Sequence, residues 1–388
     1  MELTVTKRDG SKEPLDLEKF HRVVAYACEG IAGVSASEVE IRSHIQFYDK
    51  ITSKDIQETL IKAASDLICD ETPNYHIVAG RLVLYDVRKE AYGQFEPHTL
   101  YDQVVNIAGL GFYEKKLLEW YTKEEFEQMD KWIDHSRDEN IAYAGMEQMR
   151  GKYLVKNRNT GQIYESPQIA MMLVAATIFH RLEDRMTWIK DFYNALSNFD
   201  ISLPTPQMAG VRTPVRQFAS CVLIESGDDL DSIYSVAHAI GKYVSQRAGI
   251  GINGGRLRAL GSSINNGHAT HTGVTPFFKL WERAVKSCSQ GGVRGGAATL
   301  YYPFWHYELE DMLVLKNNKG TENNRVRQLD YGVQFNRVMY ERLINDEDIT
   351  LFSPSDVPEL YEPFFTDVDK FRELYEQAER KTSIRKKK

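Results

Sequence analysis

The chain has 388 residues, of which 42% are hydrophobic and 27% charged. This composition excludes a disordered tail, a collagen and a small disulfide-rich scaffold, and the length fits two or three domains at about 150 residues each. The formal net charge of −7 excludes a global positive field for nucleic acid, so that any phosphate-binding patch must be local.

The first hundred residues predict a strand hairpin followed by four helices. Two short strands flank the turn at Arg8-Asp9-Gly10, and apolar residues at helical spacing follow over residues 17–31. Ser35-x-x-Glu38 and Thr52-x-x-Asp55 are typical of capping boxes that begin two further helices. Thr72-Pro73 places a cap and a first-turn proline before the fourth.

The next hundred residues predict only helices, with a cap at Thr122-x-x-Glu125 and an apolar run over residues 169–179. Beyond Pro206 the pattern changes to short β-rich runs that alternate with helices and Gly-rich loops. This alternation indicates a parallel sheet or barrel. We expect no element in the last eight residues, five of which are positively charged. The β-rich runs cover residues 218–225, 299–304 and 349–352.

The run Gly249-Ile-Gly-Ile-Asn-Gly254 matches the dinucleotide motif G-x-G-x-x-G. A Rossmann site needs a strand before that motif, a helix after it and an acidic residue about twenty positions later. Here residues 232–248 predict a helix, and residues 265–279 hold no carboxylate. A nicotinamide or flavin enzyme is therefore disfavoured, and a P-loop is excluded because no G-x-x-x-x-G-K-[ST] occurs.

Four cysteines are too few and too scattered for a disulfide framework or a zinc cluster, so we predict no metal site. With no apolar leader and no long apolar stretch, we expect a cytoplasmic protein. Cys221 lies in an apolar strand, where packing in the core is the ordinary role of a cysteine, and Cys69 is expected to pack on a helix face. The other two cysteines are Cys28 and Cys288.

Two sets of residues could bind phosphate. The loop over residues 289–297 holds four glycines around Arg294, which fits a loop ordered by a ligand better than an idle surface loop. Lys7, Arg8, Lys19 and Lys89 form a phosphate clamp if the fold brings them together, and otherwise a solvated charged surface.

Longer motifs resemble the large (α) subunit of class Ia ribonucleotide reductase, over the whole chain but only over the N-terminal half of that family. They include Val5-Thr-Lys-Arg-Asp-Gly10, Ala91-Tyr-Gly-Gln-Phe-Glu-Pro97, Ser202-Leu-Pro-Thr-Pro206, the segment 244–253 and Asn324-Arg-Val-Arg327. The resemblance implies α/β architecture in three parts. These are an ATP-cone over 1–92, a helical N-terminal domain over 93–215 and the first half of a ten-stranded α/β barrel over 216–388.

The resemblance also implies three sets of contacts and one reducing thiol. Gln57 stands where the family commonly has His. ATP and dATP would contact Lys7, Arg8, Glu13, Lys19, Ser53 and Lys89. A deoxynucleoside triphosphate that sets specificity would contact Asp228, Ser245 and Arg258, with Gln290 relaying its identity. The substrate would contact Thr205, Ser220, Cys221, Ala248, Gly249 and Arg294, and Cys221 would be one of two reducing thiols.

The family's radical Cys and catalytic base lie in an Asn-x-Cys-x-Glu strip, and none of the four cysteines has these neighbours. We therefore expect one piece of a split reductase, inactive alone. The alternative is a truncated, non-catalytic nucleotide-binding regulatory protein. A split enzyme needs a chain with the other barrel half, a small subunit with a diiron-tyrosyl radical, and thioredoxin or glutaredoxin as reductant. Its large subunits would self-associate, and it would bind neither membrane nor nucleic acid.

Overall fold

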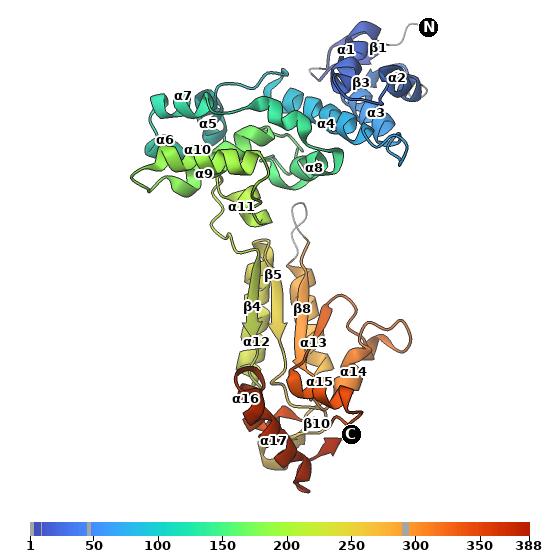
Figure 1. The fold of residues 1–388 in the computed structure, drawn as a ribbon, viewed down its shortest axis with the longest axis vertical. Coiled ribbons are helices and arrows are strands. Elements are labelled where there is room, and N and C mark those ends of the chain that lie inside the picture. The colour runs from blue at the N-terminus through green and yellow to red at the C-terminus, as the bar shows by residue number, and fades with distance from the viewer. Residues whose placement is uncertain (1–3, 9, 45–47, 289–294) are drawn as a thin grey trace. The chain divides into compact units, whose positions relative to one another are not determined.

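The computed structural model describes residues 4–8, 10–44, 48–288 and 295–388 (Figure 1). The chain divides into two compact units, Met1–Phe218 and Ala219–Lys388, which we call the N-terminal and C-terminal units. Each unit has hydrophobic clusters of its own.

The N-terminal unit begins with a three-stranded sheet and four helices. β1 (Thr4–Thr6) lies between β2 (Lys12–Pro14), to which it is antiparallel, and β3 (Ile51–Thr52), to which it is parallel. The predicted hairpin is therefore confirmed, and β3 is a strand that the sequence did not indicate. The helices are α1 (Leu17–Cys28), α2 (Ala36–His44), α3 (Ser53–Ser65) and α4 (Tyr75–Tyr92).

Side-chain caps determine where these helices begin. The carboxylate of Asp16 accepts two backbone N–H groups in the first turn of α1, and the Thr52 hydroxyl accepts one at the start of α3. The predicted cap at Thr72 is wrong, because its hydroxyl donates to the carbonyl of Leu67. α4 begins after Asn74, whose side chain makes no cap hydrogen bond.

Helices form the rest of this unit, as predicted. Thr122 and Glu125 make both hydrogen bonds of the expected capping box. The expected apolar run forms the central helix, in which residues 167–176 are all buried. The elements are α5 (Leu100–Gly109), α6 (Leu117–Trp120), α7 (Lys123–Asp130), η1 (His135–Asn140), α8 (Tyr143–Gln148), the π-helical turn η2 (Met149–Tyr153), α9 (Pro167–Phe179), α10 (Arg185–Ser197) and α11 (Thr205–Gly210).

α4 joins the sheet-bearing part to the helical part. It packs against α3 as well as against η1 and α8. The approach is closest at Gly80, where a Cβ atom would lie 2.3 Å from the carbonyl oxygen of Ile141. A single cluster of buried side chains runs from Phe20 to Met208, so the core is continuous through the N-terminal unit.

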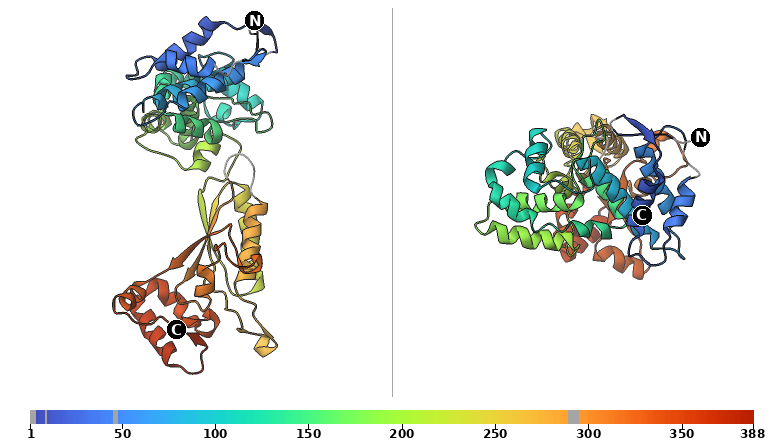
Figure 2. Two further views of the ribbon diagram at one scale, coloured as in Figure 1. Left: turned by 90° about the vertical axis from the view of Figure 1, so that its right-hand side faces the viewer. Right: turned by 90° about the horizontal axis from the view of Figure 1, so that it is seen from above.

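The C-terminal unit is built on a parallel four-stranded sheet in the order β4-β5-β8-β9. α12 (Leu230–Ser245) and α13 (Thr275–Ser287) connect its strands and cover one face (Figure 2). The expected β/α alternation is confirmed. The glycine-rich run forms a strand, which agrees with the exclusion of a Rossmann loop. The strands are β4 (Cys221–Glu225), β5 (Gly249–Asn253), β8 (Ala298–Pro303) and β9 (Asp330–Gln334).

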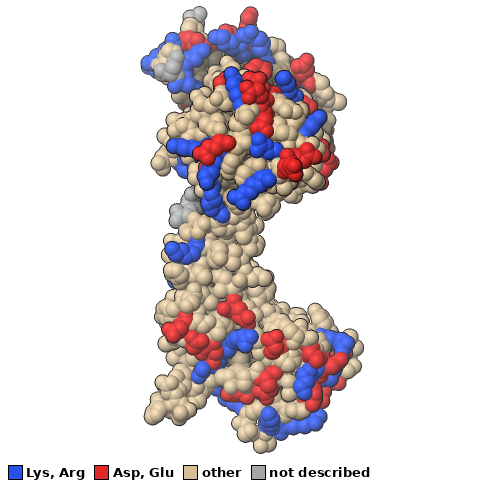
Figure 3. Space-filling view, turned by 90° about the vertical axis from the view of Figure 1, so that its left-hand side faces the viewer, with Lys and Arg blue, Asp and Glu red and all other residues tan. Residues whose placement is uncertain are grey.

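The other face of this sheet is open. Because side chains alternate along a strand, Val222 and Ile224 pack on the helix-covered side, whereas Leu223 is 83% exposed. The side chain of Leu223 lies over Gly251. A Cβ atom added to Gly251 would lie 2.5 Å from Cδ2 of Leu223. Figure 3 shows the molecule from another side, on which few Lys, Arg, Asp or Glu side chains lie in the middle of the picture. The open face therefore presents Leu223 and Tyr301 next to Gly251, with Glu225, Asn253 and Gln334 at the ends of their strands.

The rest of the C-terminal unit packs around an aromatic cluster that includes Phe304, Trp305 and Phe371. The expectation that the last eight residues form no element is wrong, because β11 (Lys386–Lys387) pairs antiparallel with β10 (Leu351–Phe352). β10 therefore lies outside the parallel sheet. The other elements are β6 (Ser263–Ile264), η3 (Asn265–Gly267), β7 (Ala269–Thr270), α14 (Leu309–Leu313), η4 (Glu322–Asn324), α15 (Arg337–Ile344), η5 (Pro354–Asp356), η6 (Pro358–Leu360), α16 (Tyr361–Thr366) and α17 (Val368–Arg380).

Residues 4–8, 10–44, 48–288 and 295–388 contain neither a helix that could span a membrane nor a cluster of metal ligands. No helix in these ranges has the length and apolar character needed to cross a membrane. Within the same ranges, no three His, Cys, Asp or Glu side chains come together as ligands for a metal ion.

Candidate functional site

A cavity of about 160 Å³ lies among β1, α1 and α3. Four of the six residues predicted to contact ATP and dATP line it. Apolar side chains form the rest of its wall, chiefly those of Val5, Phe20, Val23, Ile56 and Leu60. Two lysines, paired with Glu13 and Asp16, stand beside the apolar wall. This suits a nucleoside phosphate, because the base can pack while the ammonium groups meet the phosphates. The four predicted residues are Lys7, Glu13, Lys19 and Ser53.

Glu13 is the centre of charge at this cavity. Its carboxylate lies 2.8 Å from Nζ of Lys7 and 3.4 Å from Nζ of Lys19. The hydrogen bond from Lys7 holds the pKa of Glu13 below its usual range. Because all three side chains are more than one-third exposed, a phosphate can replace the carboxylate without stranding a buried charge.

Gln57 lines the same cavity and is 6% exposed. Its Nε2 donates to the carbonyl oxygen of Leu82 on α4 at 2.8 Å. This hydrogen bond fixes the side chain and ties α3 to α4, so one of its two amide donors is already used by the fold.

Arg8 and Lys89 do not line the cavity. Nη2 of Arg8 lies 2.7 Å from Oδ1 of Asp86 on α4. Nζ of Lys89 lies 6.0 Å from the ring centre of Tyr85 on the same helix. The structure thus brings four of the six predicted residues together at the cavity. Of the other two, Arg8 contacts α4 through Asp86, and Lys89 is part of α4.

Cys221 begins β4 and is exposed, so packing in the core, the ordinary role of a lone cysteine, does not apply to it. It lies in register with Gly249 on β5, whose N–H donates to the carbonyl of Ser220 at 2.8 Å. Ala248 is buried directly before β5. Four of the predicted substrate contacts therefore lie together at the start of two neighbouring strands.

The other predicted substrate and relay residues are elsewhere. Thr205 is the first residue of α11, in the N-terminal unit. Gln290 and Arg294 lie outside the described residues.

The remaining cysteines differ in exposure. The expected packing of Cys69 is wrong, because it is exposed in the loop after α3, where the helix has already ended. Cys28 packs against the core, and burial raises the pKa of its thiol to about 11. Cys288 is half-buried at the end of α13. Cys221 therefore combines exposure with a place on the sheet, where its thiol can react.

The residues predicted to bind the specificity effector are brought together only in part. Arg258 donates through Nε to Oδ2 of Asp228 at 2.8 Å, and its backbone N–H donates to Oδ1 at 2.7 Å. Ser245 is the last residue of α12, whereas Asp228 precedes that helix. At about 1.5 Å per residue, roughly 24 Å of helix separates them, so only a long ligand could touch both.

Three family models match the chain. They are "ATP cone domain" over residues 3–90, "Ribonucleotide reductase, all-alpha domain" over 139–216 and "Ribonucleotide reductase, barrel domain" over 219–388. The chain belongs to the ribonucleotide reductase large-subunit family. It carries the N-terminal portion of that subunit, with the ATP cone, the all-alpha domain and part of the barrel domain.

Curated relatives agree along the whole chain. It is 61% identical over 386 residues to ribonucleoside-diphosphate reductase 1 subunit alpha of Escherichia coli (strain K12), covering 99% of this chain and 51% of the relative. Subunit alpha of Enterobacteria phage T4 is 49% identical over 99% of this chain and 51% of the relative. That of Helicobacter pylori is 31% identical over 97% and 47%. The chain thus spans about half the length of the curated relatives it matches.

The chain holds an ion-pair cluster that the sequence did not indicate. Arg150, at the start of the π-helical turn η2, lies 2.8 Å from Glu58, 3.4 Å from Asp86 and 2.7 Å from Glu147. Since Asp86 also holds Arg8, the cluster links the ATP cone to the all-alpha domain. Its members lie up to 142 residues apart along the chain, so no local pattern marks them.

A second group missed by the sequence lies at the open face of the barrel sheet. The hydroxyl of Tyr361 donates to Glu225 at 2.7 Å and accepts from Nδ2 of Asn253 at 2.8 Å. Arg256 lies 2.9 Å from the same carboxylate. Partial burial opposes ionisation, but hydrogen bonds from Tyr361 and Arg256 hold the pKa of Glu225 below its usual range. The carboxylate of Glu225 therefore lies, charged, at the end of β4 on the open face of the sheet.

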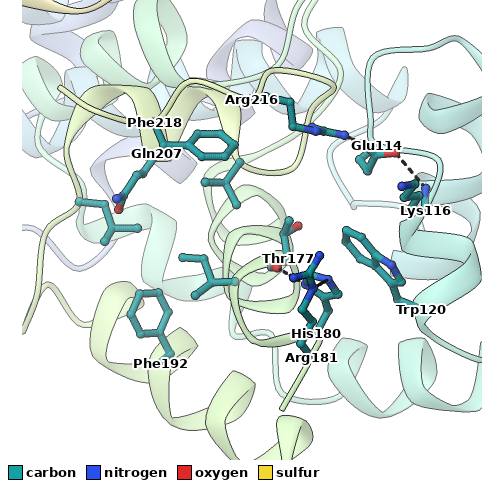
Figure 4. Close-up of a pocket in the computed structure, with 13 residues that line it drawn as sticks. Glu114, Lys116, Trp120, Thr177, His180, Arg181, Phe192, Gln207, Arg216 and Phe218 are labelled. Carbon is teal, nitrogen blue, oxygen red and sulfur yellow. Dashed lines mark hydrogen bonds and ion pairs between the residues drawn. The ribbon is translucent and has the colours of Figure 1, made fainter. Parts of the chain in front are cut away.

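A larger cavity of about 580 Å³ lies within the all-alpha part of the reductase chain (Figure 4). The rings of Trp120 and His180 stack with their centres 3.7 Å apart, and Arg216 pairs with Glu114 at the rim. Gln207 also lines it, two residues after Thr205 on α11. These side chains come from separate segments, so no local sequence pattern marks the cavity.

Proposed function

We propose that this chain acts as the N-terminal half of the large subunit of a ribonucleoside-diphosphate reductase. It senses ATP and dATP in its ATP cone and supplies Cys221 as one of two reducing thiols. The observation that carries this proposal is the exposed thiol of Cys221 on a sheet with an open face, where Leu223 is also exposed.

The chemistry assigned to Cys221 is a two-electron reduction. Two thiols become one disulfide, their two electrons reduce the ribose 2′ carbon, and the 2′-hydroxyl leaves as water. A thiyl radical and a carboxylate base start the reaction, and both belong to the other half of the barrel. The second thiol is also outside this chain, so the disulfide formed during turnover joins two polypeptides.

The effector and substrate residues follow the same proposal. ATP and dATP bind Lys7, Arg8, Glu13, Lys19, Ser53 and Lys89 in an ATP-cone over 1–92. The specificity effector binds Asp228, Ser245 and Arg258, with Gln290, in the barrel over 216–388. The substrate binds Thr205, Ser220, Cys221, Ala248, Gly249 and Arg294, with the helical domain over 93–215 contributing Thr205.

The partner is a polypeptide that carries the remaining barrel strands. β4 and β9 are the outer strands of the sheet in the described residues, and each presents unpaired backbone N–H and C=O groups. Exposed apolar side chains on an open sheet face, here Leu223 and Tyr301, are normally covered by another chain or segment. The small subunit with its diiron-tyrosyl radical, and thioredoxin or glutaredoxin, complete the system.

The test is reconstitution. The 388-residue chain is mixed with a polypeptide that carries the C-terminal half of the large subunit, with the small subunit, a ribonucleoside diphosphate and dithiothreitol, and deoxynucleotide is measured. Product should form only when both halves are present. Sustained turnover by this chain and the small subunit alone would contradict the split-enzyme proposal.

The second candidate function is nucleotide-dependent regulation without catalysis. The observation that favours it is the cavity in the ATP cone, which this chain completes by itself. Calorimetry on the full chain would then show ATP binding, while every reconstituted mixture stays inactive.

A further inference from the structure

Asp86 is a buried carboxylate whose partners are two arginines. Its side chain is 1% exposed, and it lies 2.7 Å from Nη2 of Arg8 and 3.4 Å from Nη1 of Arg150. The two arginines differ in what else they hold. Arg150 also pairs with Glu58 and Glu147, whereas Asp86 is the one carboxylate within ion-pair distance of Arg8 in the described residues.

Arg8 is well placed to change partners. Its side chain is 38% exposed, and it directly follows Lys7, which lines the cavity of the ATP cone. A guanidinium group binds carboxylate and phosphate with the same fork of donors. A bound nucleoside triphosphate and Asp86 therefore compete for the same cation.

Loss of Arg8 from Asp86 does not leave the carboxylate unpaired, because Arg150 remains beside it. A buried charge without a partner is costly. When Arg8 leaves, Arg150 is the remaining cation that pairs with Asp86. Arg150 must then tighten on Asp86 at the expense of Glu58 or Glu147, both of which are more exposed.

Arg150 stands at the start of a chain of contacts that reaches α11. It lies in η2, and π-helical turns of this kind are frequent at functional sites. The carbonyl of Tyr153, at the end of η2, accepts from Nη2 of Arg212 at 2.9 Å. Nη1 of Arg212 donates to the carbonyl of Met208 in α11, at 2.5 Å. α11 begins with Thr205, one of the proposed substrate contacts.

We propose that Asp86 sets the affinity of the ATP cone for nucleoside triphosphates by competing with the ligand for Arg8, and that Arg150 relays the exchange through η2 to α11. Asp86 and Arg150 are thus positioning residues. The inference rests on the proposed function in one respect, that the cavity binds ATP or dATP.

The first experiment measures ATP affinity by calorimetry on the full 388-residue chain. Asp86→Asn should bind ATP about tenfold more tightly, the effect of freeing one charge-assisted hydrogen bond. Arg8→Ala should bind more weakly, and Asp86→Asn in the Arg8→Ala background should change nothing further, because Asp86 acts through Arg8. Asp70→Asn removes an equal charge from an exposed loop residue and should leave the affinity unchanged.

Arg150→Gln gives an independent result that does not need a folded Asp86 variant. With Arg150 gone, Asp86 holds Arg8 more firmly, so ATP binding should weaken several-fold. Lys152→Gln is the matched control, since Lys152 is exposed on the same π-helical turn.

The relay is tested by hydrogen exchange with and without saturating ATP. Amides over residues 149–153 and 205–210 should change their exchange rates when ATP binds to the wild type and the Lys152→Gln chain, but not in Arg150→Gln. A ligand-dependent change that persists in Arg150→Gln would overturn the relay.

The outcomes separate this inference from the proposed function. If the wild type and all variants ignore ATP and dATP, the proposed nucleotide site itself is wrong. If the wild type binds ATP, but Asp86→Asn and Arg150→Gln both bind it with unchanged affinity, the site stands and the competition by Asp86 is refuted.

Discussion

Cys221 and Cys28 show how position in the fold separates thiols of equal intrinsic chemistry. Burial raises the pKa of Cys28 to about 11, which keeps it a protonated, unreactive side chain. Cys221 is exposed at the first position of β4, beside a glycine strand that leaves room for a ligand. Its side chain contributes little packing, so a reactive thiol explains a cysteine at this position better than a structural role does.

Replacing Cys221 by Ser tests this assignment. The change keeps the size of the side chain but removes two-electron chemistry, so the reconstituted enzyme should lose product formation. Because the site is exposed, the free energy of unfolding should stay within about 0.5 kcal/mol of the wild type, and nucleotide binding should be normal. The measurements are dithiothreitol-supported turnover and urea denaturation.

Cys69→Ser is the control, since Cys69 is exposed but lies in the N-terminal unit. Non-reducing electrophoresis after turnover without reductant should show a cross-link to the partner half in the wild type and in Cys69→Ser only. Full turnover by Cys221→Ser would end the assignment.

At the scale of elements, α4 is the helix on which the N-terminal unit depends. It packs against α3 of the ATP cone and against η1 and α8 of the all-alpha part. It also carries Asp86. Its closest approach is at Gly80, against the backbone of Ile141. The position of α4 therefore determines where Asp86 lies relative to Arg8 and Arg150. The proposed exchange of ion-pair partners at Asp86 depends on that position.

Gly80→Ala should destabilise the protein despite the better helix propensity of alanine. The propensity gain is roughly 1 kcal/mol, but the new Cβ would lie 2.3 Å from a backbone oxygen, and overpacking of this kind costs about 1–3 kcal/mol or more. The urea midpoint should therefore fall.

The matched control is Gly109→Ala at the end of α5, where a Cβ would meet no atom within 4 Å. It should leave the midpoint unchanged or raise it. Equal midpoints for Gly80→Ala and the wild type would show that α4 can shift at no cost.

At the scale of the whole molecule, the open sheet of the C-terminal unit is the feature that calls for a partner. One face is packed by α12 and α13, while the other exposes Leu223 beside Gly251 and Tyr301. Leu223 gains little from folding in this chain alone, since it is 83% exposed. Burial of such a side chain would stabilise association by about 1.5–3 kcal/mol.

Leu223→Glu should therefore leave the isolated chain as stable as the wild type and prevent assembly with the C-terminal half. Co-purification of differently tagged halves, followed by turnover, measures both effects. Leu343→Glu, on α15 and 69% exposed, is the control and should assemble normally. Assembly of Leu223→Glu at wild-type strength would show that the partner does not cover this face.

The sequence by itself determined the local elements and the family. Turn residues, cap spacing and periodicity act over a few residues. They predict the hairpin, the capping box at Thr122, the buried helix that contains residues 167–176 and the parallel β/α alternation. The long motifs carried the resemblance to ribonucleotide reductase. Of the four predicted cone residues that line the cavity, three lie in the hairpin and the first helix, and Ser53 begins α3.

Only the tertiary structure decided what depends on distant segments. The exposure of Cys221 and Cys69 depends on which face of a sheet is covered and where a helix ends. The pairing of β11 with β10 joins Leu351 to Lys387 and Phe352 to Lys386, residues 36 and 34 positions apart. The partner of Arg8 depends on where α4 lies in the folded chain. The ion pairs Arg8–Asp86 and Asp86–Arg150 join segments 78 and 64 residues apart and leave no periodic trace in the chain.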